Sequence, residues 1–137
     1  MPLQPDHFKW TCANVLIGSG DPYSTAGGKA FELAASKMQI EVYVKAKYVS
    51  GSRDMKAAIK EIIDKRCRVT VVFGQAQDLT SLFLEAHKQR YDGEWVVGES
   101  IIANLDGVVN DLKRHLAENS VHDLLRGMHG HCYLYLT

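Results

Sequence analysis

Short runs of apolar residues alternate along the chain with longer segments whose apolar positions have helical spacing. The run 15–17 is continuously apolar and leads into a glycine-rich loop. The run 69–74 is rich in β-branched residues and apolar on both faces, which is typical of a central strand covered by helices. The run 40–46 alternates apolar and polar residues, as a half-buried edge strand does. In total, five strands are predicted, at 15–17, 40–46, 69–74, 94–98 and 132–136.

Helices are predicted between these strands, because each intervening segment combines a capping residue with apolar positions on one face. Ser24 or Thr25 is expected to cap the first helix, and Ser52 or Asp54 the second. Asp78 is expected to cap the third, which should end at 91–93. The second helix has the clearest i, i+3, i+4, i+7 spacing. A further helix is predicted at about 105–116, and a short helical turn carries Val121, Leu124 and Leu125.

Strands that alternate with helices in this way predict an α/β fold with right-handed crossovers and a parallel sheet. We expect a three-layer sandwich with a five-stranded sheet in the order 2-1-3-4-5, flavodoxin-like or Rossmann-like, because the less apolar strand at 40–46 belongs at an edge. Ligands of such sheets bind beyond the carboxyl ends of the strands, near the switch point between the first and third strands. That rule places 19–24, 75–77 and 99–100 on one rim.

The length and charge of the chain limit the functions that it can have. The 137 residues correspond to one α/β domain, 1–137, without an internal repeat or linker. Sixteen basic residues balance sixteen acidic ones, so the composition does not favour a nucleic-acid partner. No apolar run approaches the roughly 18 residues of a membrane span, and the first ten residues lack the apolar core of a secretory signal.

The three cysteines, Cys12, Cys67 and Cys132, are far apart and form no CxxC pair, which argues against a structural zinc site. Base rates favour three reduced and mostly buried cysteines. Cys12 and Cys67 each lie just before a predicted strand, however, and could be neighbours if those strands pair in parallel. Whether these two cysteines form a disulfide is left open by the sequence.

The usual phosphate-binding and catalytic motifs fail at the loop after the first strand. The segment Gly18-Ser19-Gly20 begins like GxGxxG, but Tyr23 occupies the sixth position. Ser19 lacks the GxSxG spacing of a hydrolase nucleophile, and Lys29 is not followed by the serine or threonine of a P-loop. Asp21 and Glu99 could pair as in a phosphotransfer site, but the third strand is not followed by an acid. We therefore predict no catalytic residues and no cofactor.

His129, His131 and Cys132 form one cluster with metal-ligand residue types, since alternate strand residues point the same way. Two histidines do not complete a site, so an exposed loop without metal is the favoured interpretation. The aromatic residues fall into two groups, those expected to pack in the core or an interface and one expected to contact a ligand. Trp10 and Trp95 flank strands and are expected to pack in the core or an interface. Tyr23 lies beside a proline in the switch-point loop, which makes it the strongest single candidate for a ligand contact.

Six short segments also follow one another in an order typical of a known family. They are Phe8-Lys9-Trp10 before the first strand, 21–27, 50–54, 68–78, 91–99 and Leu124-Leu125-Arg126-Gly127. Together they resemble the second lobe of type I periplasmic-binding-protein folds. This is the receptor ligand-binding region of branched-chain amino-acid binding proteins, natriuretic-peptide receptors and class C receptors. The resemblance spans 7–130, with Ser24 where the family has glycine.

The resemblance implies that the chain is half of a two-lobed binding protein, with Tyr23 and Glu99 facing a ligand held between the lobes. The phenol hydroxyl would form a hydrogen bond with the ligand, and the carboxylate would bind an amino group. Together with the predicted rim, the candidate ligand-binding residues are Asp21, Tyr23, Ser24, Gln75 and Glu99. The first lobe, which usually contacts the ligand's carboxylate, does not fit in 137 residues.

Two functions from different classes follow. The first is a non-enzymatic lobe that binds a small amine or amino acid weakly on its own, or binds a protein that covers the face of the missing lobe. The alternative is a structural or accessory subunit that kept the fold and docks on a larger assembly. A receptor lobe would be extracellular or periplasmic, whereas the sequence as written, starting at Met1 without a signal, points to the inside of a cell, so the compartment is left open.

Overall fold

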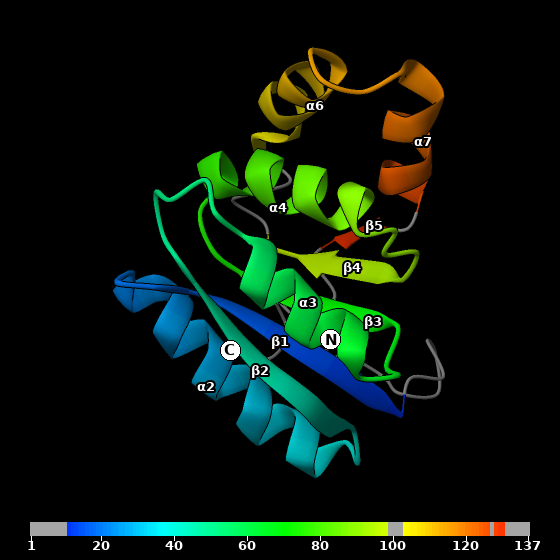
Figure 1. Cartoon of the computed structure of the whole chain (residues 1–137). Coiled ribbons are helices and arrows are strands. Elements are labelled where there is room, and N and C mark those ends of the chain that lie inside the picture. Colours follow the sequence, from blue (N-terminus) through cyan, green and yellow to red (C-terminus); the bar gives the residue numbers. More distant parts are fainter. Residues whose placement is uncertain (1–10, 99–102, 127, 131–137) are drawn as a thin grey trace.

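The computed structural model of the chain describes residues 11–98, 103–126 and 128–130, and its core is a parallel sheet (Figure 1). The strands occur in the order β2-β1-β3-β4-β5, and every neighbouring pair is parallel. The predicted order 2-1-3-4-5 is therefore confirmed. The strand bounds are β1 Cys12–Ser19, β2 Glu41–Val49, β3 Val69–Phe73, β4 Glu94–Val97 and β5 Met128–Gly130.

The described part of the last strand lies just before the predicted range. The three residues of β5, Met128–Gly130, pair with β4 from Trp95 to Val97. We expected this strand at 132–136, which lies outside the described residues. Four strands thus form the body of the described sheet, and β5 is a short fifth strand at its edge (Figure 1).

Helices cover both faces of the sheet, which confirms the three-layer prediction. One core cluster joins α2 to one face through Phe31 and Ala35. The other cluster joins the opposite face to helices α3, α4, α6 and α7, through residues such as Ile59, Leu82 and Leu112 (Figure 1). The helix bounds are α2 Pro22–Lys37, α3 Lys56–Asp64, α4 Ala76–Lys88, α6 Leu105–Lys113 and α7 Glu118–Arg126.

Burial along the strands explains the strand order. All five residues of β3 are buried, and six consecutive residues of β1 are buried, because helices lie on both sides of these strands. In β2, Val44, Ala46 and Tyr48 are buried whereas Tyr43 and Val49 are exposed. The alternation that we noted at 40–46 thus continues to residue 49, and it places β2 at the edge. Each fully buried aliphatic side chain contributes about 1.5–3 kcal/mol.

The predicted N-cap residues were wrong for three helices. Helix α2 begins at Pro22, and its N-cap is Asp21 rather than Ser24 or Thr25. Proline suits this first position because its missing N–H would have no partner there. The Asp21 carboxylate instead accepts a hydrogen bond from the backbone N–H of Tyr23, at 3.2 Å.

Helices α3 and α4 also start elsewhere than predicted. Met55 is the N-cap of α3, without a side-chain cap, while Ser52 and Asp54 stabilise the approach by accepting bonds from the N–H groups of Asp54 and Lys56. Helix α4 begins at Ala76, so Asp78 lies in its first turn rather than at its cap. The helix ends at Lys88, before the predicted 91–93.

Cys12 and Cys67 form a disulfide, with their Cα atoms 6.0 Å apart. The expectation of three reduced cysteines was therefore wrong for these two, and Cys132 lies outside the described residues. The tertiary cause is the parallel pairing of β1 with β3, in which Asn14 is opposite Thr70. The Nδ2 group of Asn14 also donates a hydrogen bond of 2.9 Å to the carbonyl of Cys67.

Two further predictions can be compared with the structure. Trp95 is buried and packs between Phe83 and Tyr91, with ring centroids 5.1 and 4.9 Å away, which confirms its core assignment. Trp10 lies outside the described residues. Within the described ranges, no helix combines the length and hydropathy required to cross a membrane.

Candidate functional site

The carboxyl ends of β1 and β3 bring together four of the five predicted site residues. Asp21 follows β1, and its Oδ2 atom accepts hydrogen bonds from Ser24 Oγ at 2.6 Å and from Gln75 Nε2 at 2.9 Å. Gln75 follows β3 and is 54 positions away in the sequence. We call Asp21, Tyr23, Ser24 and Gln75 the switch-point rim. Glu99, the fifth predicted residue, lies outside the described residues.

The rim residues differ in their exposure and in how many of their polar groups are available to a ligand. Tyr23 is 55% exposed, so its phenol ring is available at the first turn of α2. Ser24 is fully buried, and its hydroxyl is already donated to Asp21. Gln75 is exposed, but one of the two N–H groups of its side-chain amide is donated to the same carboxylate. Tyr23 and the remaining lone pairs of Asp21 are therefore the groups most able to meet a ligand.

The hydrogen bonds also fix the charge of Asp21. Donation from Ser24 and then from Gln75 lowers the pKa of the Asp21 carboxyl below its ordinary value, because both bonds favour the ionised form. The rim consequently carries a negative charge at neutral pH, next to an aromatic side chain. A carboxylate beside a phenol is suited to an ammonium group and not to an anion.

Tyr48 is a buried residue near the switch-point rim that the sequence analysis missed. It ends the buried side of β2, is only 4% exposed, and its hydroxyl has no hydrogen-bond partner within the described residues. Burial, followed by the charges of Asp78 and Asp21, raises the pKa of this phenol, so it stays protonated. The signal was available in the alternation of β2 beyond residue 46, which continues through Tyr48.

Glycines on the two neighbouring strands make room for the Tyr48 ring. A side chain at Gly18 or Gly74 would meet the Tyr48 hydroxyl or the ring carbon that carries it. Gly18 lies near the carboxyl end of β1 and Gly74 directly follows β3, at the edge of the sheet where the rim lies. The Tyr48 hydroxyl therefore packs against both glycines, and an added Cβ would crowd it most at Gly74.

Asp78 organises the loop that follows β2. It is buried, and its two carboxylate oxygens accept hydrogen bonds from Ser50 Oγ at 3.0 Å and from the N–H of Gly51 at 2.9 Å. Gly51 has a φ of 88°, a conformation that a residue with a side chain rarely adopts. The first turn of α4 therefore holds the loop between β2 and α3, and this tertiary role replaces the capping role that we predicted.

Within the described residues, no group of three or more His, Cys, Asp or Glu side chains is placed to hold a metal ion. Of the histidine cluster near the end of the chain, His131 and Cys132 lie outside the described residues, so the interpretation of that cluster as a metal-free loop stays a prediction.

A match to one family model covers most of the chain. The family model described as receptor family ligand binding region matches residues 5–130. A comparison with curated proteins found no match. Among solved structures, the branched-chain amino acid transporter substrate binding protein LivJ from Streptococcus pneumoniae, in complex with isoleucine, has 16% identity and a TM-score of 0.68 over 79% of this chain.

Two further structures are similar to the chain in fold. A periplasmic binding protein type 1 from Bordetella pertussis has 14% identity and a TM-score of 0.71 over 90% of this chain. A putative branched-chain amino acid ABC transporter from Rhodospirillum rubrum has 13% identity and a TM-score of 0.70 over 78%. Each match covers 30% of the other protein, so this chain spans less than a third of their length.

Proposed function

Because the chain belongs to the receptor ligand-binding region family, we propose that it is one lobe of a two-lobed protein that holds a small amine or amino acid. The observation that carries the proposal is the ionised, hydrogen-bonded Asp21 beside the exposed Tyr23 at the topological switch point. Ligands of parallel α/β sheets bind at this point. The isoleucine bound to the similar LivJ structure supports the choice of an amino acid as ligand.

In this proposal the rim residues have distinct roles. Tyr23 contacts the ligand directly, and the Asp21 carboxylate attracts its ammonium group. Ser24 and Gln75 orient that carboxylate through their hydrogen bonds. Glu99 would add a second carboxylate for the amino group, as the family resemblance implies.

Binding rather than catalysis fits the rim as described. Acyl or phosphoryl transfer requires a nucleophile, a base and an orienting group in mutual contact. Ser24, the hydroxyl nearest to the rim carboxylate, is buried and donates to Asp21, so it cannot reach a substrate without breaking that bond. We therefore propose that this lobe has no enzymatic activity.

A lone lobe should bind weakly. Good pockets enclose about 70–90% of a small ligand, whereas one face of a cleft covers roughly half of it. We expect a dissociation constant of about 1 mM or weaker for the chain by itself, which corresponds to about 4 kcal/mol. A protein that covers the rim would supply the missing contacts.

One observation favours the alternative function, an accessory subunit that kept the fold and docks on a larger assembly. The Ser24 hydroxyl and the Gln75 amide satisfy the Asp21 carboxylate internally, which leaves few polar groups for a small molecule. In that case, Tyr23 would be an anchor for a protein partner, since exposed tyrosines are common centres of interfaces.

Calorimetry on the chain separates these functions. Isoleucine and a basic amino acid such as lysine are titrated into the natural sequence, into Tyr23→Ala and into the control Tyr43→Ala, which removes another exposed tyrosine on β2. The ligand-binding proposal expects millimolar binding that Tyr23→Ala abolishes and Tyr43→Ala leaves unchanged. Absence of any amino-acid binding, or binding that is insensitive to Tyr23→Ala, would contradict it.

A further inference from the structure

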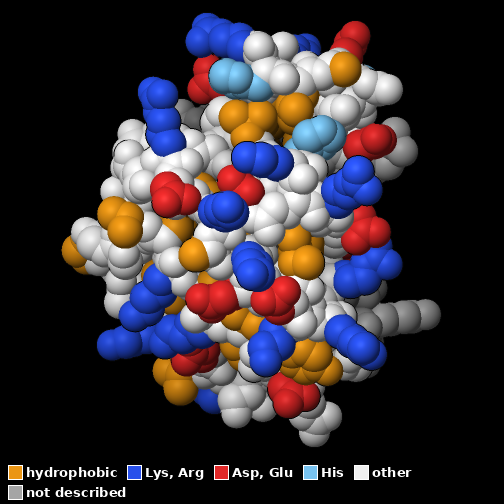
Figure 2. All heavy atoms as spheres, viewed as in Figure 1, with side chains coloured by type: hydrophobic (Ala, Val, Ile, Leu, Met, Phe, Trp, Pro, Cys, Tyr) orange, Lys and Arg blue, Asp and Glu red, His pale blue; other side chains and the backbone are white. Residues whose placement is uncertain are grey.

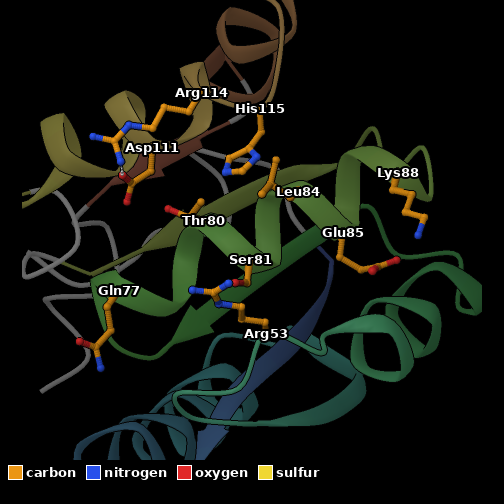
Figure 3. A pocket seen from close by; sticks show the side chains of 10 residues that line it. All are labelled: Arg53, Gln77, Thr80, Ser81, Leu84, Glu85, Lys88, Asp111, Arg114 and His115. Carbon is orange, nitrogen blue, oxygen red and sulfur yellow. Dashed lines mark ion pairs between the residues drawn. The ribbon is translucent and has the colours of Figure 1, made fainter.

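A second concave region lies on the opposite side of α4 from the sheet, away from the Asp21 carboxylate. Helix α4 forms its floor, and the end of α6 and the loop before α3 form its walls (Figure 3). The cavity measures about 480 Å³, which is within the range of small-molecule sites. We call it the α4 groove.

The α4 groove has an excess of positive charge. Three cationic side chains, Arg53, Lys88 and Arg114, line it against two acids, Glu85 and Asp111. Basic side chains are spread over this face of the molecule, with acidic ones between them (Figure 2). Because the chain as a whole is neutral, this excess is a local property of the groove.

Both acids of the groove are already engaged. Asp111 forms an ion pair with Arg114, at 3.5 Å on the same helix. Glu85 accepts a hydrogen bond of 2.8 Å from the side-chain amide of Gln89. The side chains of Arg53 and Lys88, in contrast, form no hydrogen bond or ion pair with any of the described residues. Because the Gln89 amide is neutral, Glu85 keeps its negative charge, and the charges of Arg53 and Lys88 exceed it by one.

Neutral donors lie between these charges. Thr80 and Ser81 present hydroxyls from the middle of α4, and neither hydroxyl forms a hydrogen bond within the described part of the chain. Arg53 projects from the loop toward Ser81, and His115 projects from the end of α6 toward the same stretch of α4 (Figure 3). Guanidinium, hydroxyl and imidazole donors thus converge from three segments.

We propose that the α4 groove binds a small, multiply charged oxyanion, with Arg53 as its principal contact. A guanidinium presents paired N–H donors that match two oxygens of a phosphate or carboxylate group. The Ser81 and Thr80 hydroxyls would donate to the remaining oxygens, and Lys88 would add attraction as a point charge. This site goes beyond the amine-binding rim, because its charge selects ligands of the opposite sign.

The test uses inorganic phosphate and citrate as probes, titrated separately at constant ionic strength and followed through the backbone amide resonances of α4. Phosphate is an inorganic oxyanion and citrate an organic one. Their relative affinities therefore show which of the two kinds of oxyanion the groove prefers. We expect saturable, millimolar binding of at least one probe. Arg53→Gln should weaken it by about tenfold or more, the loss of one charge-assisted contact.

The control is Lys60→Gln, which removes the same charge from the exposed face of α3 outside the groove. It should leave the affinity within about twofold, because an exposed charge outside the site is screened by solvent and salt. Melting temperatures of both variants verify that the fold is intact. The proposal is overturned if neither probe saturates below about 20 mM, or if Arg53→Gln and Lys60→Gln weaken binding equally. Loss of amino-acid binding at Tyr23 would not affect this result.

Discussion

The disulfide between Cys12 and Cys67 should be a major source of stability. It closes a loop of 55 residues that contains β1, α2, β2 and α3. In the chain-entropy description, such a crosslink restricts the unfolded chain and stabilises the fold by about 4 kcal/mol. The free energy of unfolding of a small domain is about 5–15 kcal/mol, so loss of the crosslink should remove a large share of the stability.

Urea denaturation of the oxidised chain and of Cys12→Ala/Cys67→Ala measures this contribution. Alanine is the suitable replacement because Cys67 is buried and a serine hydroxyl there would need a partner. We expect the free energy of unfolding to fall by about 4 kcal/mol, and the chain denatured without reductant to show one free thiol of its three cysteines. Two results would refute the reasoning: a difference below about 1 kcal/mol, or three free thiols before reduction.

Two further predictions concern the groups around the switch-point rim. Tyr48→Phe should leave the free energy of unfolding unchanged or raise it by about 1 kcal/mol, because it removes a buried hydroxyl without a partner. Tyr91→Phe is the matched control and should lower the free energy of unfolding by about 1 kcal/mol, because the Tyr91 hydroxyl is hydrogen-bonded to Thr70 Oγ1 at 2.8 Å. Urea denaturation measures both variants, and equal losses of stability would contradict the expected difference. Because the pKa of Asp21 is lowered from 3.8, its contribution to stability is complete above that value and is lost as the pH falls further. Below pH 3.8, the urea concentration at the unfolding midpoint should therefore decrease less steeply with falling pH in Asp21→Asn than in the natural sequence. An unchanged pH profile would show that Asp21 contributes nothing to this pH dependence.

The sequence by itself determined the layer architecture and the strand order. An apolar run that is buried on both faces, such as 69–73, indicates helices on both sides, and the alternation of buried and exposed residues along β2 is typical of an edge strand. These patterns are local, so they can be read without knowing the partners of each strand. The switch-point rule then placed Asp21, Tyr23 and Gln75 on one rim, and the hydrogen bond from Gln75 to Asp21 agrees with that placement.

Only the tertiary structure decided which polar groups pair across the sheet. Asp78 has the sequence context of a cap, but the loop at Ser50 and Gly51 offers it two donors, so it binds the loop instead. The burial of Tyr48 depends on glycines at the ends of two other strands, and the pairing of Cys12 with Cys67 depends on the register of β1 against β3. Each of these contacts joins segments far apart in the chain, so its energy depends on a geometry that no local pattern encodes.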